Sequence, residues 1–270
     1  MTDQLALPAD VLANIQRRCQ MSRTHGQPMS LKSSKPSASA TKRHRAASSQ
    51  PATDSSQPWT PQTARWCCAA ARAPAAAVAV ALADLGAGPR IHEIIVDDHG
   101  TWTVADRVRP GTPLSRTDPT TVNPQKLFAP LASMRDQPAP LPSMPSVLDW
   151  LRDRLEDDSL TDLRPGTSVA PLHERQAALA VLDDLVRDHV PGLCHGDASS
   201  GNIIASGNSR RMYIDPRGVA GEHVYDVAVL SIRVAQAYAG AEVVAIAADI
   251  AGVAEERLRA WVQVASAARV

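Results

Sequence analysis

The stretch that most constrains the fold is His195-Gly196-Asp197-Ala198-Ser199-Ser200-Gly201-Asn202, which is followed by Ile214-Asp215-Pro216. Phosphoryl transfer needs a carboxylate that orients the incoming hydroxyl, beside an amide oxygen and a second carboxylate that hold Mg²⁺ on the phosphates. Asp197, Asn202 and Asp215 are residues of these types at kinase-like spacing. The motif therefore predicts a kinase that acts on a small molecule.

The residues between Asn202 and Asp215 predict a hairpin that brings the two together. Residues 203–205 and 211–214 have the composition of short strands, and residues 206–209 have that of a turn. Opposite residues in an antiparallel pair lie about 5 Å apart, so one cation can take an oxygen from each side of the open end.

These residues resemble the aminoglycoside phosphotransferase family, whose catalytic loop reads His-Gly-Asp, then Asn five residues later, then Ile-Asp. The continuation Asp-Pro-Arg-Gly-Val-Ala-Gly-Glu over 215–222, with Tyr225-Asp226, is most similar to the streptomycin 6-phosphotransferase branch. The resemblance implies a protein-kinase-like fold with ATP and Mg²⁺ as cosubstrates. It also implies that Asp197 is the catalytic base and that Asn202 and Asp215 bind the metal.

Two residues beside the motif have simpler interpretations. Because a carboxylate already serves as the base, we interpret His195 as a structural histidine of the loop. We interpret Cys194 as a small buried residue.

Upstream, residues 91–96 and 101–108 predict two strands joined by the turn Asp97-Asp98-His99-Gly100. In the family, this second strand leads into the hinge. The resemblance therefore implies that backbone groups near Arg107 and Val108 bind the adenine edge. A plain surface hairpin is the alternative.

Periodic apolar positions predict helices in the C-terminal part, two of them between the hinge and the catalytic loop. Ser146 is expected to cap a helix that ends near Asp157, and other helices are expected over 172–190, 225–239 and 242–270. The core-facing residues should be Val147, Leu148, Leu151 and Leu155 in the first helix, and Leu172, Leu179, Leu182, Leu185 or Val186, and Val190 in the second.

Acidic residues of the same region are candidates for substrate binding, because carboxylates would hold a polycationic substrate. Glu222 and Asp226 are the candidates beside the motif. Exposed helix faces explain Glu255 and Glu256 at least as well.

The first ninety residues lack the expected parts of a nucleotide lobe, in which a strand lysine reaches the phosphates and pairs with a helix glutamate. Lys32 is the best candidate for the phosphate-binding lysine, although a solvated loop lysine explains it better, and no glutamate precedes Glu93. The alanine-rich run 75–85, with Gly86 as its C-cap, predicts the end of the expected helix.

Composition divides the chain into four parts. An N-terminal helix is expected over 1–22, a low-complexity and disordered segment over 23–77, a remnant of the N-terminal lobe with the hinge over 78–114, and the catalytic lobe over 115–270. The predicted fold class is α+β, protein-kinase-like and two-lobed, with a mainly helical C-terminal lobe and a degraded or disordered N-terminal lobe.

The charge of the N-terminal part leaves two alternatives open. Residues 1–92 contain eleven Lys and Arg, four Asp and no Glu, a net charge of +7 in a chain whose total is zero. A basic arm attracts nucleic acid, but with only Trp59 and Trp66 to stack on bases we do not expect this partner. The other alternative is a coding frame that was shifted in this segment and regained before Ala83.

The cysteines Cys19, Cys67, Cys68 and Cys194 show no metal-ligand spacing, which predicts a reduced, cytoplasmic protein. The start of the chain does not resemble a signal peptide, and no apolar run approaches the roughly 18 residues of a membrane span. We therefore expect a monomer with a small-molecule substrate and no membrane partner.

Together these patterns predict an ATP-dependent phosphotransferase that acts on a hydroxyl of a small polar molecule. An aminoglycoside is the leading substrate class, in antibiotic resistance or self-protection. One alternative is a catalytically impaired kinase-like protein without the phosphate-binding lysine and its glutamate partner. Another is a kinase of a different small alcohol, such as choline or homoserine.

Overall fold

The computed structural model describes residues 66–71, 73–97, 100–118, 121–163, 165–207, 210–235 and 242–270, which belong to one compact unit. The backbone alone is described for residues 66–71, 97 and 100. The predictions for 1–22, for 23–65 and for Lys32 lie outside the described residues.

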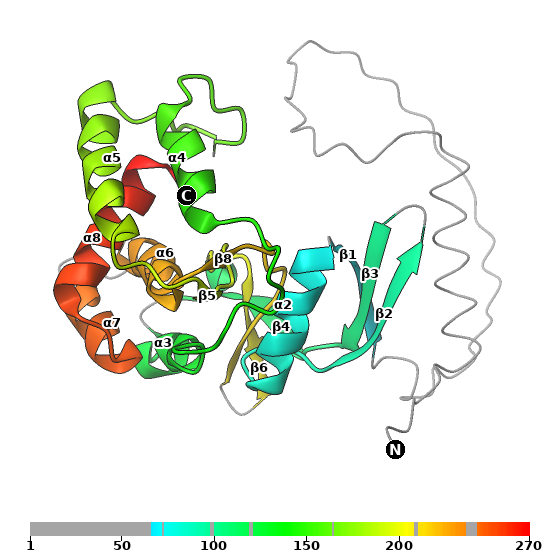
Figure 1. Cartoon of the computed structure of the whole chain (residues 1–270). Helices are drawn as coiled ribbons and strands as arrows, with labels where there is room; N and C mark the ends of the chain where they lie inside the picture. Colours follow the sequence, from blue (N-terminus) through cyan, green and yellow to red (C-terminus); the bar gives the residue numbers. More distant parts are fainter. Residues whose placement is uncertain are drawn as a thin grey trace, which may run out of the picture. The chain divides into compact units, whose positions relative to one another are not determined.

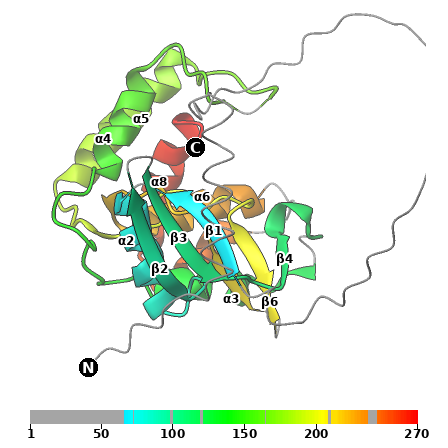
Figure 2. The same cartoon turned by 90° about the vertical axis from the view of Figure 1, so that its right-hand side faces the viewer.

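The first described elements form a sheet with one helix packed against it. The elements are β1 (Trp66–Ala71), α2 (Ala73–Asp84), β2 (Ile91–Asp97) and β3 (Gly100–Asp106). β3 is the central strand of an antiparallel sheet with the order β1-β3-β2, and α2 packs against β2 and β3 (Figures 1 and 2). The predicted pair of strands is confirmed, although the second strand ends at Asp106 and not at residue 108.

The C-terminal boundary of the segment expected to be disordered, 23–77, is placed too far along the chain. Its last residues form β1 and the start of α2, whose Ala75, Ala76, Val78 and Leu82 are buried. Alanine has the highest helix propensity, so an alanine-rich run with buried positions favours a helix over disorder. The predicted C-cap is confirmed, since Gly86 has φ +69° and its N–H donates to the Ala83 carbonyl at 3.0 Å.

The predicted hairpin is confirmed. β6 (Ile203–Ser206) pairs with β7 (Arg211–Tyr213), and Ile203 lies opposite Tyr213. β4 (Pro110–Pro113), which precedes the 3₁₀ turn η2 (Leu114–Arg116), adds to β6 and completes the order β4-β6-β7. The short strands β5 (Gly192–Leu193) and β8 (Ala220–Gly221) pair separately. Residues 195–202 and 214–216 therefore lie in the connections between these two small sheets.

The remaining elements are helical and enclose the main hydrophobic core. They are α3 (Pro124–Ala132), α4 (Val147–Glu156), α5 (Leu172–Val186), α6 (His223–Ala235), α7 (Val243–Ala251) and α8 (Glu255–Ala267). α6 packs against α7 and α8, and α5 contacts both α4 and α8 (Figure 1). The predicted cap of α4 is confirmed, because the Ser146 hydroxyl accepts a hydrogen bond from Leu148 N–H at 3.1 Å. The fold class is α+β.

Three described α-helices, and not two, lie between the expected hinge and the loop at 195–202. The unpredicted helix α3 begins at Pro124, and the Asn123 side chain caps it by accepting from Gln125 N–H at 2.9 Å. An Asn followed by Pro at the first helical position was the available sequence signal.

The predicted core face of 172–190 is wrong in part. The helix ends at Val186, and Leu172, Val186 and Val190 are 59%, 45% and 73% exposed. The buried face instead comprises Arg175, Ala178, Leu182 and Leu185. Arg175 is buried because its guanidinium donates to the Leu155 carbonyl at 2.7 Å and the Ala170 carbonyl at 3.0 Å, and pairs with Asp158.

The expected final helix over 242–270 consists of two helices. Gly252 has φ +65° and ends α7 in the left-handed conformation, which residues other than glycine rarely adopt. The break lets α8 turn back and bury Trp261 completely.

Candidate active site

His195 is a structural residue of the loop, as its sequence interpretation proposed. Its Nδ1 atom accepts a hydrogen bond from Asp197 N–H at 3.2 Å, so in the neutral ring Nε2 carries the proton and donates to the Ile214 carbonyl at 3.0 Å. Complete burial lowers the pKa of His195 to about 4. The neutral ring therefore links the loop to Ile214, the residue that follows β7.

Asp226 anchors the same loop from α6. Its two carboxylate oxygens accept hydrogen bonds from His195 N–H at 2.7 Å and Gly196 N–H at 2.9 Å. Burial raises the pKa of Asp226 to about 7, although both backbone hydrogen bonds oppose the rise. Asp226 is 0% exposed, so its expected place in a substrate cleft is wrong: it lies beneath the loop.

Asn202 directly precedes β6 and Asp215 follows β7 by two residues, so both lie at the open end of the hairpin. The Asn202 side-chain amide donates to the Asp197 carbonyl at 3.0 Å, and the Asn202 carbonyl accepts from Ile214 N–H at 2.9 Å. Asp215 follows with φ +58°, a left-handed conformation that Asp tolerates better than most residues. Burial and the nearby Asp197 carboxylate raise the pKa of Asp215, against the opposing effect of Arg217.

These contacts bring Asp197, Asn202 and Asp215 into one small region, although the motif spans nineteen positions of the sequence. The described residues contain no group of three His, Cys, Asp or Glu side chains arranged to hold a metal. A cation here would therefore need the Asn202 amide oxygen together with carboxylate oxygens. Mg²⁺ prefers such oxygen ligands and usually keeps several waters, so the donor set fits it.

The expected hinge adjoins this region. Arg107 is exposed and Val108 is partly buried, and both lie between β3 and β4. β4 then pairs with β6 of the hairpin, and Ser115 N–H donates to the Ser200 carbonyl of the catalytic loop at 2.9 Å. The backbone after β3 is thus attached to the catalytic loop.

A close contact joins the loop after Asp215 to α2. Gly218 has φ +81°, and a Cβ atom there would lie 2.4 Å from the Ala75 backbone nitrogen. Only glycine fits this approach, because both the backbone conformation and the space exclude a side chain.

Gly218→Ala is expected to lower the free energy of unfolding by about 3 kcal/mol, because it adds a backbone clash to the cost of positive φ. Urea unfolding measures this loss. Gly166→Ala is the matched control, since Gly166 has the same φ of +81° with nothing within 4 Å, and it should cost about 1 kcal/mol. Equal losses in the two variants would show that the contact with α2 has no energetic importance.

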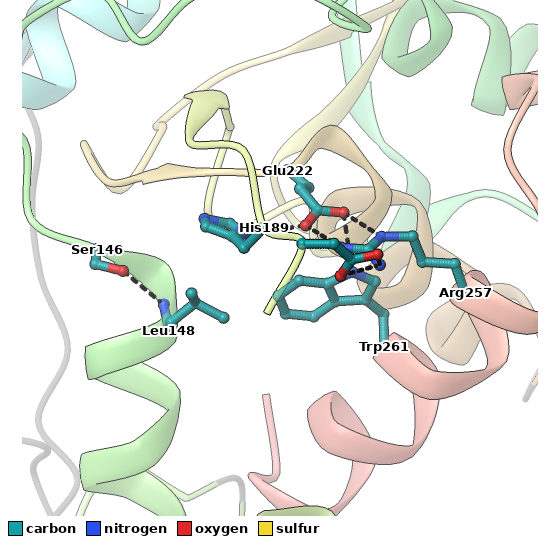
Figure 3. A network of polar contacts seen from close by, with 7 residues as sticks. Ser146, Leu148, His189, Glu222, Arg257 and Trp261 are labelled. Atoms are coloured by element: carbon teal, nitrogen blue, oxygen red, sulfur yellow. Dashed lines mark hydrogen bonds and ion pairs between the residues drawn. The ribbon is translucent and has the colours of Figure 1, made fainter. Parts of the chain in front are cut away.

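Glu222 belongs to a polar network, which Figure 3 shows. Its side chain is 11% exposed and accepts hydrogen bonds from His189 Nδ1 at 2.8 Å, Arg257 Nε at 2.7 Å and Trp261 Nε1 at 3.4 Å. Arg257 also pairs with Asp188 at 2.9 Å. The network links α8 to His189, which precedes β5, and to Glu222, which follows β8. The expectation that Glu222 binds substrate is therefore corrected.

Partial burial would raise the pKa of Glu222, but hydrogen bonds from Arg257 and His189 outweigh it and lower the pKa to about 2 from 4.5. A lowered pKa contributes stability above pH 4.5 that is lost as the pH falls toward 2. We expect Glu222→Gln to cost about 2 kcal/mol near pH 7 and progressively less below pH 4.5.

Urea unfolding of both proteins from pH 3 to pH 7 tests this expectation. Glu255→Gln is the control, because Glu255 forms an exposed pair with Arg259 on the surface of α8. A difference for Glu222→Gln that does not change with pH would contradict the ionic role of the network.

The expected lysine–glutamate pair is absent from β1 and α2. β1 contains no lysine and α2 contains no glutamate. Lys126, exposed on α3, is the only lysine within the described ranges.

Sequence reasoning did not assign two residues near the loop at 195–202, Arg217 and Trp150. Arg217 forms an ion pair with Asp197 and packs on the Trp150 ring, and it directly follows Asp215-Pro216 in the sequence.

In the described part of the chain, no helix combines the length and apolar character needed to cross a membrane.

Comparisons with solved structures agree with this fold. Aminoglycoside phosphotransferase APH(3'')-Id from Streptomyces rimosus, in complex with ADP and streptomycin, is 18% identical with a TM-score of 0.52, over 76% of this chain and 87% of that one. A choline/ethanolamine kinase family protein from Mesorhizobium loti is 19% identical with a TM-score of 0.53, over 73% and 68%. An aminoglycoside phosphotransferase from Alicyclobacillus acidocaldarius is 15% identical with a TM-score of 0.50, over 77% and 74%. The fold is therefore that of kinase-like phosphotransferases.

A search of curated protein sequences gave no match. The sequence profile of the aminoglycoside/hydroxyurea antibiotic resistance kinases, in contrast, matches residues 126–270, which include the whole catalytic motif and the helices around it. The motif, the fold and this match agree, and the chain belongs to the aminoglycoside/hydroxyurea antibiotic resistance kinase family.

Proposed function

We propose that this protein transfers the γ-phosphate of ATP to a hydroxyl of a small polar molecule, with aminoglycosides as the leading substrate class. The observation that carries the proposal is the convergence of Asp197, Asn202 and Asp215 on a loop that buried side chains hold from below. The aminoglycoside class is supported by the family and by the similarity to an enzyme solved with streptomycin.

In the proposed reaction Asp197 is the catalytic base. Its side chain is 33% exposed, so it can accept a hydrogen bond from the acceptor hydroxyl. The proton passes to Asp197 as the bond from the acceptor oxygen to phosphorus forms and the bond to the leaving ADP breaks. The Asn202 hydrogen bond to the Asp197 carbonyl keeps the base close to the hairpin.

Asn202 and Asp215 would hold the metal through their side-chain oxygens. When bound, Mg²⁺ would supply positive charge that offsets the charge on the transferring phosphoryl group. The raised pKa of Asp215 fits this role, because a partly desolvated carboxylate beside a second carboxylate is stabilised by a cation. The backbone near Arg107 and Val108 would bind the adenine edge.

A second candidate is a kinase-like protein with impaired catalysis. The observation that favours it is the absence of a lysine from β1 and of a glutamate from α2, since kinases use such a pair to hold the phosphates. A kinase of another small alcohol remains the third candidate, which the similarity to a choline/ethanolamine kinase family protein supports.

The test is ATP consumption by the purified protein with Mg²⁺ and a panel of acceptors. The panel comprises aminoglycosides including streptomycin, together with choline and homoserine. Turnover with an aminoglycoside alone supports the leading proposal, and turnover with choline or homoserine alone supports the third candidate. A folded sample without turnover on any acceptor would overturn the proposed activity in favour of the impaired protein.

A further inference from the structure

We propose that Arg217, supported by Trp150, is a positioning residue that holds the catalytic carboxylate of Asp197 in place. The proposal rests on the proposed function, because it assigns a role within the same site. Neither side chain belongs to the triad of Asp197, Asn202 and Asp215.

Arg217 contacts three consecutive residues of the catalytic loop. Its backbone N–H donates to the His195 carbonyl at 2.8 Å, and its side-chain Nε donates to the Gly196 carbonyl at 3.2 Å. Its Nη2 atom lies 3.8 Å from Asp197 Oδ2. The planar guanidinium therefore joins the backbone of the loop to the carboxylate that the loop presents.

Trp150 packs against the face of the Arg217 guanidinium. The Arg217 Cζ atom lies 4.2 Å from the centre of the Trp150 ring, an arrangement in which the ring attracts the cation. With its plane against an aromatic ring and its Nε on a carbonyl, the guanidinium is restrained from two directions. Asp197 consequently faces a cation with a defined position instead of a mobile surface side chain.

The ring is itself fixed from the C-terminal part of the fold. Arg154, one turn further along α4, lies 5.1 Å from the centre of the Trp150 ring. Arg154 is buried, and it donates to the Ala268 carbonyl at 3.0 Å and to Asp162 at 2.6 Å. Contacts thus run without a gap from the C-terminal segment through α4 to the catalytic base.

Lysine cannot reproduce this arrangement. A planar guanidinium can stack on a ring while its edge donates hydrogen bonds in fixed directions, whereas an ammonium group is a compact point charge. The side chain of Arg217 is 35% exposed, so a small cation from solution can reach its place after truncation.

The first test is steady-state kinetics of Arg217→Ala, Arg217→Lys and Trp150→Leu. For Arg217→Ala we expect kcat to fall about 10- to 100-fold, because small displacements of a catalytic group are costly, while KM for ATP and for the acceptor changes less than about threefold. Low concentrations of guanidinium, but not of urea, should restore part of kcat. Arg217→Lys should stay impaired, and Trp150→Leu should lose less.

Arg152→Ala is the matched control, since Arg152 lies on the same helix as Trp150 but pairs with Asp183 at the surface. It should retain kcat within about twofold. An unchanged kcat in Arg217→Ala, or a rise in KM alone, would overturn the positioning role.

Hydrogen–deuterium exchange provides a readout that needs no turnover. In Arg217→Ala the amides of residues 194–202 should exchange faster, and guanidinium should slow them again, while Arg152→Ala leaves them unchanged. If the unmodified protein phosphorylates no acceptor, the proposed function fails but the exchange still decides this inference. Equal exchange in Arg217→Ala and the unmodified protein would overturn it.

Discussion

Asp197→Ala is expected to lower phosphotransfer by about 10² to 10⁴-fold, the range found when a general base is removed. Asp197 presents a partly exposed carboxylate next to the proposed metal ligands, and the other carboxylate of the motif, Asp215, is assigned to the metal, so removal of Asp197 leaves no assigned proton acceptor. Stability should change little, because the fold uses the Asp197 backbone groups and not its carboxylate for hydrogen bonds. Product formation and thermal unfolding are to be measured on the same preparation.

Asp183→Ala is the control for this variant. Asp183 is an exposed carboxylate on α5 that pairs with Arg152, and its removal should leave turnover within about twofold. Undiminished phosphorylation by Asp197→Ala would refute the assignment of the base. A variant that fails to fold would instead show that the carboxylate is structural.

Asp226→Ala is expected to lower the free energy of unfolding by about 3 kcal/mol. The change leaves two buried N–H groups, of His195 and Gly196, without their acceptors, and each such group costs about 1–3 kcal/mol. The gain from no longer burying a carboxylate offsets part of this cost. Asp226→Asn should also destabilise the protein, since its amide nitrogen would face one of the two N–H donors.

Urea unfolding at pH 8 measures the effect above the Asp226 pKa of about 7. The control is Ser231→Ala on the same helix, whose buried hydroxyl donates to the Val227 carbonyl of its own helix at 2.7 Å, and we expect a loss of about 1 kcal/mol or less. Turnover should fall in Asp226→Ala, because the loop that carries Asp197 loses its anchor. Stability equal to that of Ser231→Ala would show that other contacts hold the loop.

Local sequence patterns were sufficient to predict the structure where neighbouring residues decide the backbone conformation. Ser146 caps α4 because its hydroxyl reaches an N–H two residues away, and Gly86 ends α2 because it alone accepts the required φ. The hairpin between Asn202 and Asp215 follows equally from two short apolar runs around a turn. Each of these features depends on only a few consecutive residues.

Prediction from sequence failed where contacts between distant residues decide which side chains are buried. Arg175 occupies a core position that its charge argues against, because the carbonyls of Ala170 and Leu155 accept hydrogen bonds from its guanidinium. The apolar Leu172 and Val190 remain exposed, since no element covers them within the described residues. Helical periodicity shows that a helix has an apolar side, but it does not identify the elements that will cover that side.

The sequence alone determined the catalytic motif, the hairpin that closes it and the family to which they belong, because these depend on residue types at short, fixed spacings. The tertiary structure decided that Asp226 lies beneath the loop, that Glu222 binds Arg257 and His189, and that Arg217 faces Asp197. These roles arise from contacts between residues up to 35 positions apart, as for Glu222 and Arg257. The burial and charge that such contacts create exist only after the chain has folded.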